Sequence, residues 1–309
     1  MKNILITGGG GFIGTHLRRK LEEQGHKVQI IDINHPDQSA GQDVTIEKTW
    51  ATLPGWHIED FVKALPDDEN DPDVIVHMAA EPNLRAVKAN PEKAYKTMTM
   101  GVMNVVKRFN ESTINPQFVF ISSSMVYGDF KDGMKEDGNT KPKNIYGEAK
   151  LAGERFTKLF QKRDNLDYIV IRPSGVYGPG DMPDRVVSKF FEKAMKNDPI
   201  TLHNGDNKVD FTYVEDTVQG IIKAATSSVA NVSFNITQGN ATSLRKLAET
   251  IIEITGSESE LEDIGNHDLY PMRGTLDISR AKDLIGYEPR YELKEGLKKY
   301  YDWIRQYSS

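Results

Sequence analysis

Near the start of the chain, the stretch Asn3-Ile4-Leu5-Ile6-Thr7-Gly8-Gly9-Gly10-Gly11-Phe12-Ile13-Gly14 runs from a short apolar segment into four consecutive glycines. An amphipathic pattern follows, with apolar side chains on one side and charged side chains on the other. This change of pattern indicates a strand followed by a helix. Glycine suits the turn between them because it has no Cβ atom and accepts backbone conformations that other residues avoid. The stretch therefore predicts a strand, a tight turn and a helix.

The glycines at positions 8, 11 and 14 and an acid further along give this turn a chemical meaning. A backbone without side chains can approach a pyrophosphate closely, and a helix N-terminus offers unpaired N–H groups and the positive end of its dipole. A second apolar run, 28–31, ends at Asp32, 24 residues after Gly8. An acid about 20 residues after such a turn binds the adenosine ribose of a dinucleotide. We therefore expect dinucleotide binding; the alternative is an α/β domain in which Asp32 merely ends a strand.

The composition excludes several classes of function. The 309 residues include 39 Lys and Arg against 45 Asp and Glu, which gives a net charge of −6 and makes a nucleic-acid partner a poor match. The chain has no cysteine, which excludes disulfides, thiolate metal sites and cysteine nucleophiles. Its 7 histidines are scattered without ligand spacing, so we expect no metal. With neither a signal-peptide pattern nor a membrane-spanning apolar run, we expect a cytoplasmic protein with no membrane association.

Strands and helices alternate along the chain. Apolar runs of strand length recur at Val74–His77, Phe118–Ile121, Tyr168–Ile171 and Ser233–Ile236. Helical patterns are predicted at Ile58–Leu65, Lys93–Glu111, Tyr146–Arg163, Arg185–Met195, Asp216–Ala225, Leu244–Thr255 and Leu293–Arg305. Such alternation predicts a parallel sheet with right-handed crossovers. Glycine and proline become frequent after Pro173, where we expect a second region that closes over the first.

Tyr146 and Lys150 are the main candidates for catalysis. They lie four residues apart at a predicted helix start, which puts both side chains on one face. A tyrosine with a pKa of about 10 is a poor base at neutral pH, and a nearby ammonium is expected to lower that pKa, so that Tyr146 can exchange the proton of an alcohol. Tyr127 and Lys131 have the same spacing, but a Gly-Asp turn separates them, so no helix is expected to align them. The alternative for Tyr146 and Lys150 is an exposed helical pair without function.

Small or polar residues follow two of the predicted strands. The segment Ser122-Ser123-Ser124 stands where Phe118–Ile121 ends, at the edge of a parallel sheet where ligands bind. One of its hydroxyls is expected to contact the reacting oxygen. The segment Met78-Ala79-Ala80 follows Val74–His77, and its small residues would tolerate a cofactor that lies across the strand ends. The alternatives are an ordinary serine turn and close packing of two elements.

Together these motifs resemble the extended short-chain dehydrogenase/reductase superfamily, in particular its NAD-dependent epimerase/dehydratase branch, over nearly the whole chain. The glycine turn is similar to the cofactor turn of that branch, and His77–Ala80 is similar to its H-x-A-A segment. The segment Ile121–Gly128 resembles its catalytic serine strand, in which counting back four residues from Tyr127 identifies Ser123. Arg172–Gly180 and Asp210–Asp216 look like its later signatures.

The resemblance implies a Rossmann fold with a doubly wound parallel sheet. Residues 1–172 would bind NAD, and a smaller substrate-binding region, 173–309, would be interleaved with the main sheet. The implied catalytic residues are Ser123, Tyr146 and Lys150. The implied cofactor contacts are Gly8, Gly11, Phe12, Ile13, Gly14, Asp32, Asp43, Val44, Met78, Ala79, Ala80, Ser122, Tyr146, Lys150 and Pro173. The implied substrate contacts are Ser123, Ser124 and Arg273.

The activity that the resemblance implies is NAD-dependent epimerisation of a nucleotide-linked sugar through a transient keto intermediate. Some positions depart from the branch. Ser124 and Met125 stand where its dehydratases and decarboxylases carry acids, and Gly175 and Val209 stand where many nucleotide-sugar members carry Asn and Arg. Without acids at these two positions, dehydration and decarboxylation lose their expected general acid or base. Gly175 and Val209 keep open a reductase or dehydrogenase (or dehydratase) that acts on a sugar or another small carbonyl substrate. A non-catalytic dinucleotide sensor also stays open, although a sensor has no need of the intact catalytic set.

The resemblance also implies a homodimer, because the branch commonly dimerises through its two long helices, here about 93–111 and 146–163. The first of these helices carries an apolar stripe that serves either the core or a subunit interface, formed by Met98, Val102, Val105, Val106 and Phe109. Met98 also stands where the branch normally has an Asn that faces the cofactor.

Overall fold

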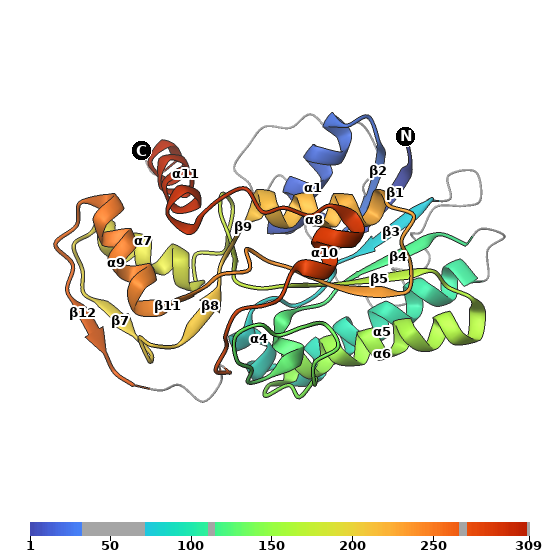
Figure 1. Ribbon diagram of the computed structural model, residues 1–309, viewed down its shortest axis with the longest axis horizontal. Helices are drawn as coiled ribbons and strands as arrows, with labels where there is room; N and C mark the ends of the chain where they lie inside the picture. The colour runs from blue at the N-terminus through green and yellow to red at the C-terminus, as the bar shows by residue number, and fades with distance from the viewer. Residues whose placement is uncertain (33–71, 111–114, 266–270, 308–309) are drawn as a thin grey trace.

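A computed structural model describes residues 1–32, 72–110, 115–265 and 271–307. Within these ranges a six-stranded sheet crosses the centre of the molecule in the order β10-β5-β4-β3-β1-β2 (Figure 1). All of its pairings are parallel. Its strands are β1 (Asn3–Thr7), β2 (Lys27–Ile31), β3 (Val74–His77), β4 (Gln117–Ile121), β5 (Tyr168–Pro173) and β10 (Val232–Ile236). The predicted doubly wound parallel sheet is therefore confirmed.

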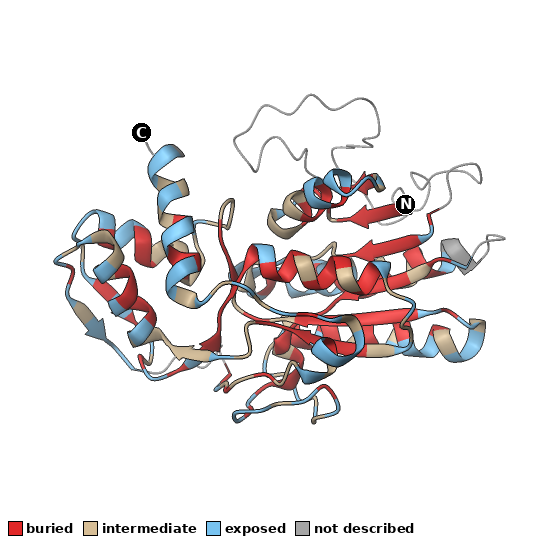
Figure 2. Cartoon of the chain, turned by 45° about the horizontal axis from the view of Figure 1, so that its top comes forward, coloured by how far each residue is buried: buried red, intermediate tan, exposed pale blue. Residues whose placement is uncertain are grey.

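Alternate residues of each strand pack against opposite layers of helices, as the period of a strand requires. In β1, Ile4 and Ile6 belong to the core on one face, which includes residues of α1 (Phe12–Glu23) and α8 (Val214–Thr226). Leu5 belongs to the core on the other face. Helices α5 (Pro91–Asn110) and α6 (Ile145–Asp164) cover that face. The strands between the two layers are almost wholly buried (Figure 2).

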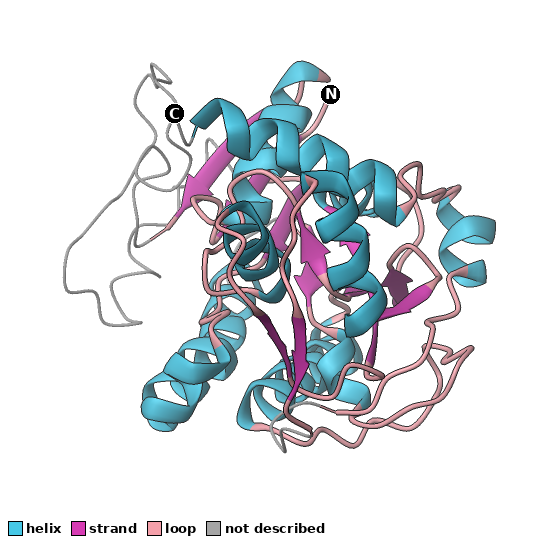
Figure 3. Ribbon diagram, turned by 90° about the vertical axis from the view of Figure 1, so that its left-hand side faces the viewer, coloured by secondary structure: helices cyan, strands magenta, loops and turns pink. Residues whose placement is uncertain are grey.

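A smaller lobe follows the main sheet and faces the viewer in Figure 3. Its core lies among α7 (Val186–Met195), α9 (Leu244–Thr255) and α11 (Leu293–Tyr307). Two short sheets pair β7 (Ile200–Leu202) with β12 (Leu261–Asp263), and β8 (Lys208–Asp210) with β11 (Ala241–Ser243). Strand β10 follows β8 in the chain but pairs with β5, so the chain returns to the main sheet after it has entered the lobe.

The helices predicted from the sequence that fall within the described residues begin and end within two residues of their observed bounds. The helix predicted at Ile58–Leu65 lies outside the described residues. Several further short elements were not predicted, because their few residues show neither a continuous apolar run nor a clear helical period. They include α4 (Leu84–Ala89), η2 (Ser124–Tyr127), β6 (Val176–Tyr177), β9 (Thr212–Tyr213) and α10 (Ser279–Ile285). Among the helices of the described ranges, none is both long and apolar enough to cross a bilayer.

Candidate active site

The glycine turn connects the carboxyl end of β1 to α1. Gly8 has a φ of +76°, in the left-handed region that favours glycine. A Cβ atom at Gly8 would lie 2.7 Å from Ala79 N, and one at Gly14 would lie 2.6 Å from Gly9 Cα, so the turn has no room for side chains at either position. The first turn of α1 lies wholly within the described residues. It contains no acidic residue, and no side chain caps the helix. Its N–H groups and the helix dipole therefore suit an anion such as a pyrophosphate.

Asp32 lies directly against this turn. Its Oδ2 atom accepts a hydrogen bond from Gly10 N–H at 2.8 Å. Met78 N–H donates to Thr7 O at 3.0 Å, which keeps the segment after β3 beside the end of β1. The predicted cofactor residues that converge on the carboxyl ends of β1, β2 and β3 are Gly8, Gly11, Phe12, Ile13, Gly14, Asp32, Met78, Ala79 and Ala80. Asp43 and Val44 lie outside the described residues.

Ser123, Tyr146 and Lys150 lie together beyond β4. The Ser123 hydroxyl is hydrogen-bonded to Tyr146, which stands in the first turn of α6. Asn144 caps this helix by accepting a hydrogen bond from Gly147 N–H at 2.9 Å. Lys150, one turn further on, places its Nζ atom 5.9 Å from the centre of the Tyr146 ring. The helical spacing of Tyr146 and Lys150 thus brings the two side chains to one place, as the sequence predicts.

The electrostatics of this group differ from expectation. Burial raises the pKa of Tyr146, and the positive charge of Arg185 and the hydrogen bond with Ser123 oppose that rise. Burial lowers the pKa of Lys150 to about 7, and the negative charge of Glu154 opposes this change. Lys150 Nζ donates to Ile121 O at 2.7 Å. The expectation that Lys150 gives Tyr146 a lowered pKa is therefore wrong here, and the cation that acts on the phenol is Arg185.

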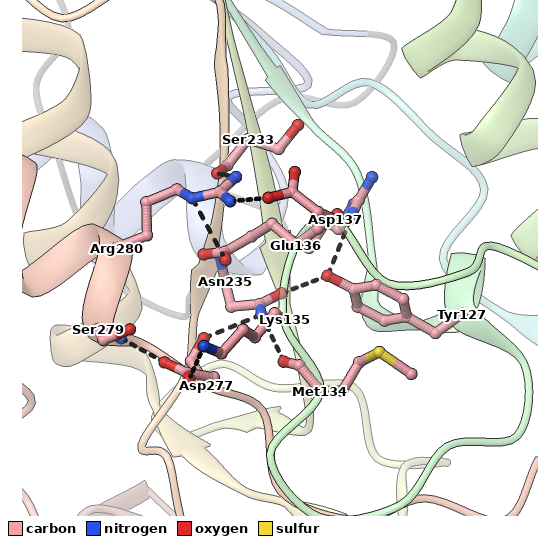
Figure 4. Close-up of polar contacts among 11 residues, drawn as sticks. Tyr127, Met134, Lys135, Glu136, Asp137, Ser233, Asn235, Asp277, Ser279 and Arg280 are labelled. Carbon is pink, nitrogen blue, oxygen red and sulfur yellow. Dashed lines mark hydrogen bonds and ion pairs between the residues drawn. The ribbon is translucent and has the colours of Figure 1, made fainter.

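The competing tyrosine, Tyr127, is part of the core. Its hydroxyl donates to Asn235 Oδ1 at 2.7 Å (Figure 4) and accepts a hydrogen bond from Arg172 Nη1 at 2.8 Å. Burial raises the pKa of Tyr127 to about 12. Lys131 lies beyond the end of η2, so no helix aligns it with Tyr127. These contacts give Tyr127 a structural role.

Ser122 directs its hydroxyl into the same core. Ser122 Oγ donates to Glu154 Oε1 at 2.6 Å, and Glu154 is paired with Arg172. Of the three consecutive serines, Ser123 and Ser124 line a cavity, whereas the Ser122 hydroxyl is engaged with α6.

A cavity of ≈ 780 Å³ lies between the sheet edge and the smaller lobe. The predicted site residues in its wall are Ser123, Ser124, Tyr146, Pro173 and Arg273. Sequence reasoning did not identify further polar residues that line it, among them Asn83, Ser174, Asp181, Arg185, Lys189 and Asn207. They lie in loops or on the exposed face of a predicted helix, where the sequence gives no sign of a shared cavity. No cluster of three or more potential metal ligands occurs in the described part of the chain.

Gly175 and Val209, two positions at which the sequence departs from the epimerase/dehydratase branch, are adjacent in the cavity wall. Gly175 has a φ of +50°, and a Cβ atom there would lie 2.7 Å from Val209 Cγ1. Both residues line the cavity, where they form a neutral patch between the sheet edge and the lobe. Met98, the third departure, is buried in a small apolar cluster with Val87, Ala94 and Ala149.

Comparisons with known proteins identify the family and the fold of this chain. The model of the NAD dependent epimerase/dehydratase family matches residues 4–237. A Methanocaldococcus jannaschii protein, provisionally named a UDP-glucose 4-epimerase, is 32% identical over 98% of either chain. The crystal structure of Thermotoga maritima UDP-glucose 4-epimerase with UDP-glucose is 27% identical, with a TM-score of 0.89, and covers 99% of this chain and 100% of that one. Bacillus cereus UDP-glucuronic acid 4-epimerase, in complex with UDP-glucuronic acid and NAD, is 26% identical, with a TM-score of 0.87 over 98% and 99% of the two chains.

Proposed function

This chain belongs to the NAD dependent epimerase/dehydratase family, and from that premise we propose that it is an NAD-dependent epimerase of a nucleotide-linked sugar. The observation that carries the proposal is the hydrogen-bonded pair of Ser123 and Tyr146 in the wall of a ≈ 780 Å³ cavity. This volume falls within the range of about 300–1,000 Å³ that is typical of small-molecule sites. The relatives from T. maritima and B. cereus, whose structures hold UDP-sugars, support the substrate class.

The glycine turn fits NAD. The close backbone contacts at Gly8 and Gly14 leave a cradle without side chains, and the α1 N-terminus faces it with its N–H groups. Asp32 would hold the adenosine ribose, since its carboxylate is fixed against the turn by Gly10. When bound, NAD supplies the reversible acceptance of a hydride from the substrate carbon.

The protein's own groups then have separate tasks. Tyr146 in its phenolate form takes the proton of the reacting hydroxyl and later returns it, and the positive charge of Arg185 favours that form. Ser123 Oγ, which is hydrogen-bonded to Tyr146, would also form a hydrogen bond with the oxygen of the reacting hydroxyl. Lys150, beside the Tyr146 ring, would reach the nicotinamide ribose. The cavity gives the transient keto sugar room to turn, so that its other face receives the hydride and the configuration inverts.

The first test is to denature the purified protein, identify any nucleotide released, and assay UDP-glucose for inversion at carbon 4. We expect about one NAD or NADH per chain and the formation of UDP-galactose. Tyr146→Phe should abolish turnover and retain the cofactor, whereas Tyr95→Phe, at an exposed position of α5, should retain both turnover and the cofactor. Wild-type turnover by Tyr146→Phe would exclude it as the base.

A second candidate is a reductase or dehydrogenase with exchangeable NAD that acts on a small carbonyl or alcohol. The neutral patch of Gly175 and Val209 favours it, because neither side chain can bind a diphosphate ionically. Release of no nucleotide, with NAD(H) bound only when it is added, would support this candidate against the epimerase.

The protein is further proposed to form a homodimer, and to be cytoplasmic in view of its lack of cysteine. Helices α5 and α6 lie side by side on one face (Figure 1) and expose the large apolar side chains Tyr95, Met100 and Leu159. Light scattering at micromolar concentration should give a dimer, and Leu159→Lys should give a monomer. A monomeric wild type would exclude the assignment.

A further inference from the structure

Arg273, one of the substrate contacts expected from the sequence, lines the cavity from a segment without helix or strand, residues 271–275. The Gly175 and Val209 patch of the same wall is neutral, so other residues must balance the negative charge of a nucleotide-linked substrate. An arginine suits this task, because its guanidinium donates paired hydrogen bonds to phosphate oxygens. Paired bonds require a fixed direction, so the binding strength of Arg273 depends on what holds its segment.

Two aspartates of the loop after η2 hold this segment, one on either side of Arg273. Asp129 Oδ1 accepts a hydrogen bond from Met272 N–H at 2.8 Å, and Asp132 Oδ1 accepts one from Thr275 N–H at 2.9 Å. Backbone N–H groups of the same loop donate in the other direction, to the carbonyl oxygens of these two segment residues, at 2.9 and 3.0 Å. The segment is therefore attached to the loop both before and after Arg273.

The segment also touches the loop directly at Gly274. A Cβ atom at this position would collide with the backbone of Lys131 and Asp132. The glycine next to Arg273 therefore permits a close approach of two backbones that a side chain would prevent. Because the backbones are in contact, the loop determines where Arg273 stands in the cavity wall.

The second oxygen of the Asp129 carboxylate connects the same loop to α6. Asp129 Oδ2 forms an ion pair with Lys143 Nζ. Lys143 also lines the cavity, and it directly precedes Asn144, the cap of the helix that carries Tyr146. Within the described structure Asp129 does not itself line this cavity. One carboxylate thus joins the segment of Arg273 to the start of the helix that carries Tyr146.

We propose that Asp129 is a positioning residue for substrate binding, which directs Arg273 at the diphosphate of the nucleotide-linked sugar by holding Met272 N–H. Without this hydrogen bond Arg273 would keep its charge, but its guanidinium would lose the fixed direction that paired hydrogen bonds to phosphate need. The negative charge of Asp129 is not what the substrate meets, since the carboxylate acts through the segment. This inference rests on the proposed function.

Three substitutions separate the two contacts of Asp129. Asp129→Ala removes both the acceptor for Met272 N–H and the ion pair with Lys143. Asp129→Asn removes the ion pair but retains a side-chain oxygen that accepts from Met272 N–H. Asp73→Ala is the matched control, because Asp73 also accepts a hydrogen bond from a backbone N–H, that of Asn3 at 2.7 Å, and precedes β3 at the other end of the strands.

The experiment is calorimetric titration of the NAD-loaded proteins with UDP, which contains the diphosphate and is not turned over. Arg273→Ala should weaken UDP binding by about 30-fold and Asp129→Ala by about tenfold, as expected when charged hydrogen bonds are lost or misdirected. Asp129→Asn should restore the affinity to within about twofold of the wild type, and Asp73→Ala should leave it unchanged.

A double variant tests whether Asp129 acts through Arg273. Asp129→Ala combined with Arg273→Ala should bind UDP as weakly as Arg273→Ala alone, because a missing guanidinium cannot be misdirected. Independent effects would instead multiply to a loss of about 300-fold.

Losses that multiply in the double variant, or equal losses in Asp129→Ala and Asp129→Asn, would overturn the positioning role and leave the proposed function intact. A lower unfolding temperature and a loss of NAD in both Asp129 variants would indicate a structural role and also overturn it. A wild-type protein that neither binds UDP nor converts UDP-glucose would instead remove the proposed function, and this inference with it.

Discussion

Glu154 and Arg172 form a doubly hydrogen-bonded ion pair in the core. Arg172 Nε and Nη2 donate to the two carboxylate oxygens at 2.8 and 2.5 Å, and the two side chains are 1% and 2% exposed. Glu154 lies one helical turn after Lys150, and Arg172 directly precedes Pro173. The pair therefore fixes α6 against the ends of β4 and β5, where the catalytic residues lie.

Arg172→Leu should strongly destabilise the protein. The substitution leaves the Glu154 carboxylate buried without its counter-ion, and breaking such a pair costs about 3–5 kcal/mol in the free energy of unfolding. Urea denaturation measures this loss. Arg163→Ala is the control, because Arg163 forms its ion pair with Asp164 at the surface with 63% of its side chain exposed. The loss in Arg163→Ala should be much smaller, because water screens a surface ion pair, and similar losses in the two variants would contradict the assigned role of the buried pair.

The parts of the site that depend on local sequence could be predicted. The turn from Gly8 to Gly14 needs glycine because of contacts within a few residues, and the spacing of Tyr146 and Lys150 translates directly into one helix face. The order of strands and helices likewise follows from local periodicity, which is why the Rossmann sheet could be predicted.

Properties that depend on distant packing could not be predicted. The pKa of Lys150 depends on burial, which no spacing reveals, and the effect of Arg185 on Tyr146 depends on where a loop of the smaller lobe returns. Ser174 and Asn207 are 33 residues apart in ordinary loop sequences, and only the folded chain places both in one cavity wall. The contact of Gly175 with Val209 is of the same kind.

The buried ammonium of Lys150 should make stability depend on pH. Its pKa is lowered to about 7, so between about pH 7 and 10.5 the unfolded chain binds a proton that the folded chain lacks. The contribution of Lys150 to stability therefore rises with pH in this window. Compared with the wild type, Lys150→Met should gain most in the free energy of unfolding at pH 6, and this gain should shrink towards pH 10. Urea denaturation at both pH values measures it.

Lys158→Met provides the control for this prediction, since Lys158 is exposed on the same helix. Its effect on the free energy of unfolding should be equally small at pH 6 and pH 10. A Lys150→Met difference that stays constant with pH, or grows as the pH rises, would contradict the lowered pKa of Lys150.

Two glycines of the same turn should respond differently to alanine. In Gly14→Ala the new methyl group would meet Gly9 Cα at 2.6 Å and Gly8 O at 2.7 Å, so the backbone must shift, and overpacking of this kind costs about 1–3 kcal/mol. In Gly11→Ala the nearest atom is Gly8 O at 3.4 Å, an ordinary contact, so the loss should stay below about 1 kcal/mol. Thermal unfolding of the nucleotide-stripped proteins compares them. Equal losses of stability in the two variants would mean that the backbone of the turn moves at little cost to accommodate a methyl group at position 14.

The position of Asp32 against Gly10 should decide the choice between NAD and NADP. A carboxylate fixed at the end of β2 repels the 2′-phosphate of NADP and accepts hydrogen bonds from the ribose hydroxyls of NAD. Asp32→Ala should reduce the ratio of NAD to NADP affinity by about tenfold or more, as measured by fluorescence titration of the stripped protein with both cofactors. Asp73→Ala is a matched control, since Asp73 also accepts a hydrogen bond from a backbone N–H, that of Asn3, but at the opposite edge of the sheet. It removes the same charge and should leave the ratio unchanged. An equal shift in both variants would trace the preference to net charge, and tighter binding of NADP than NAD by the wild type would exclude the role of Asp32.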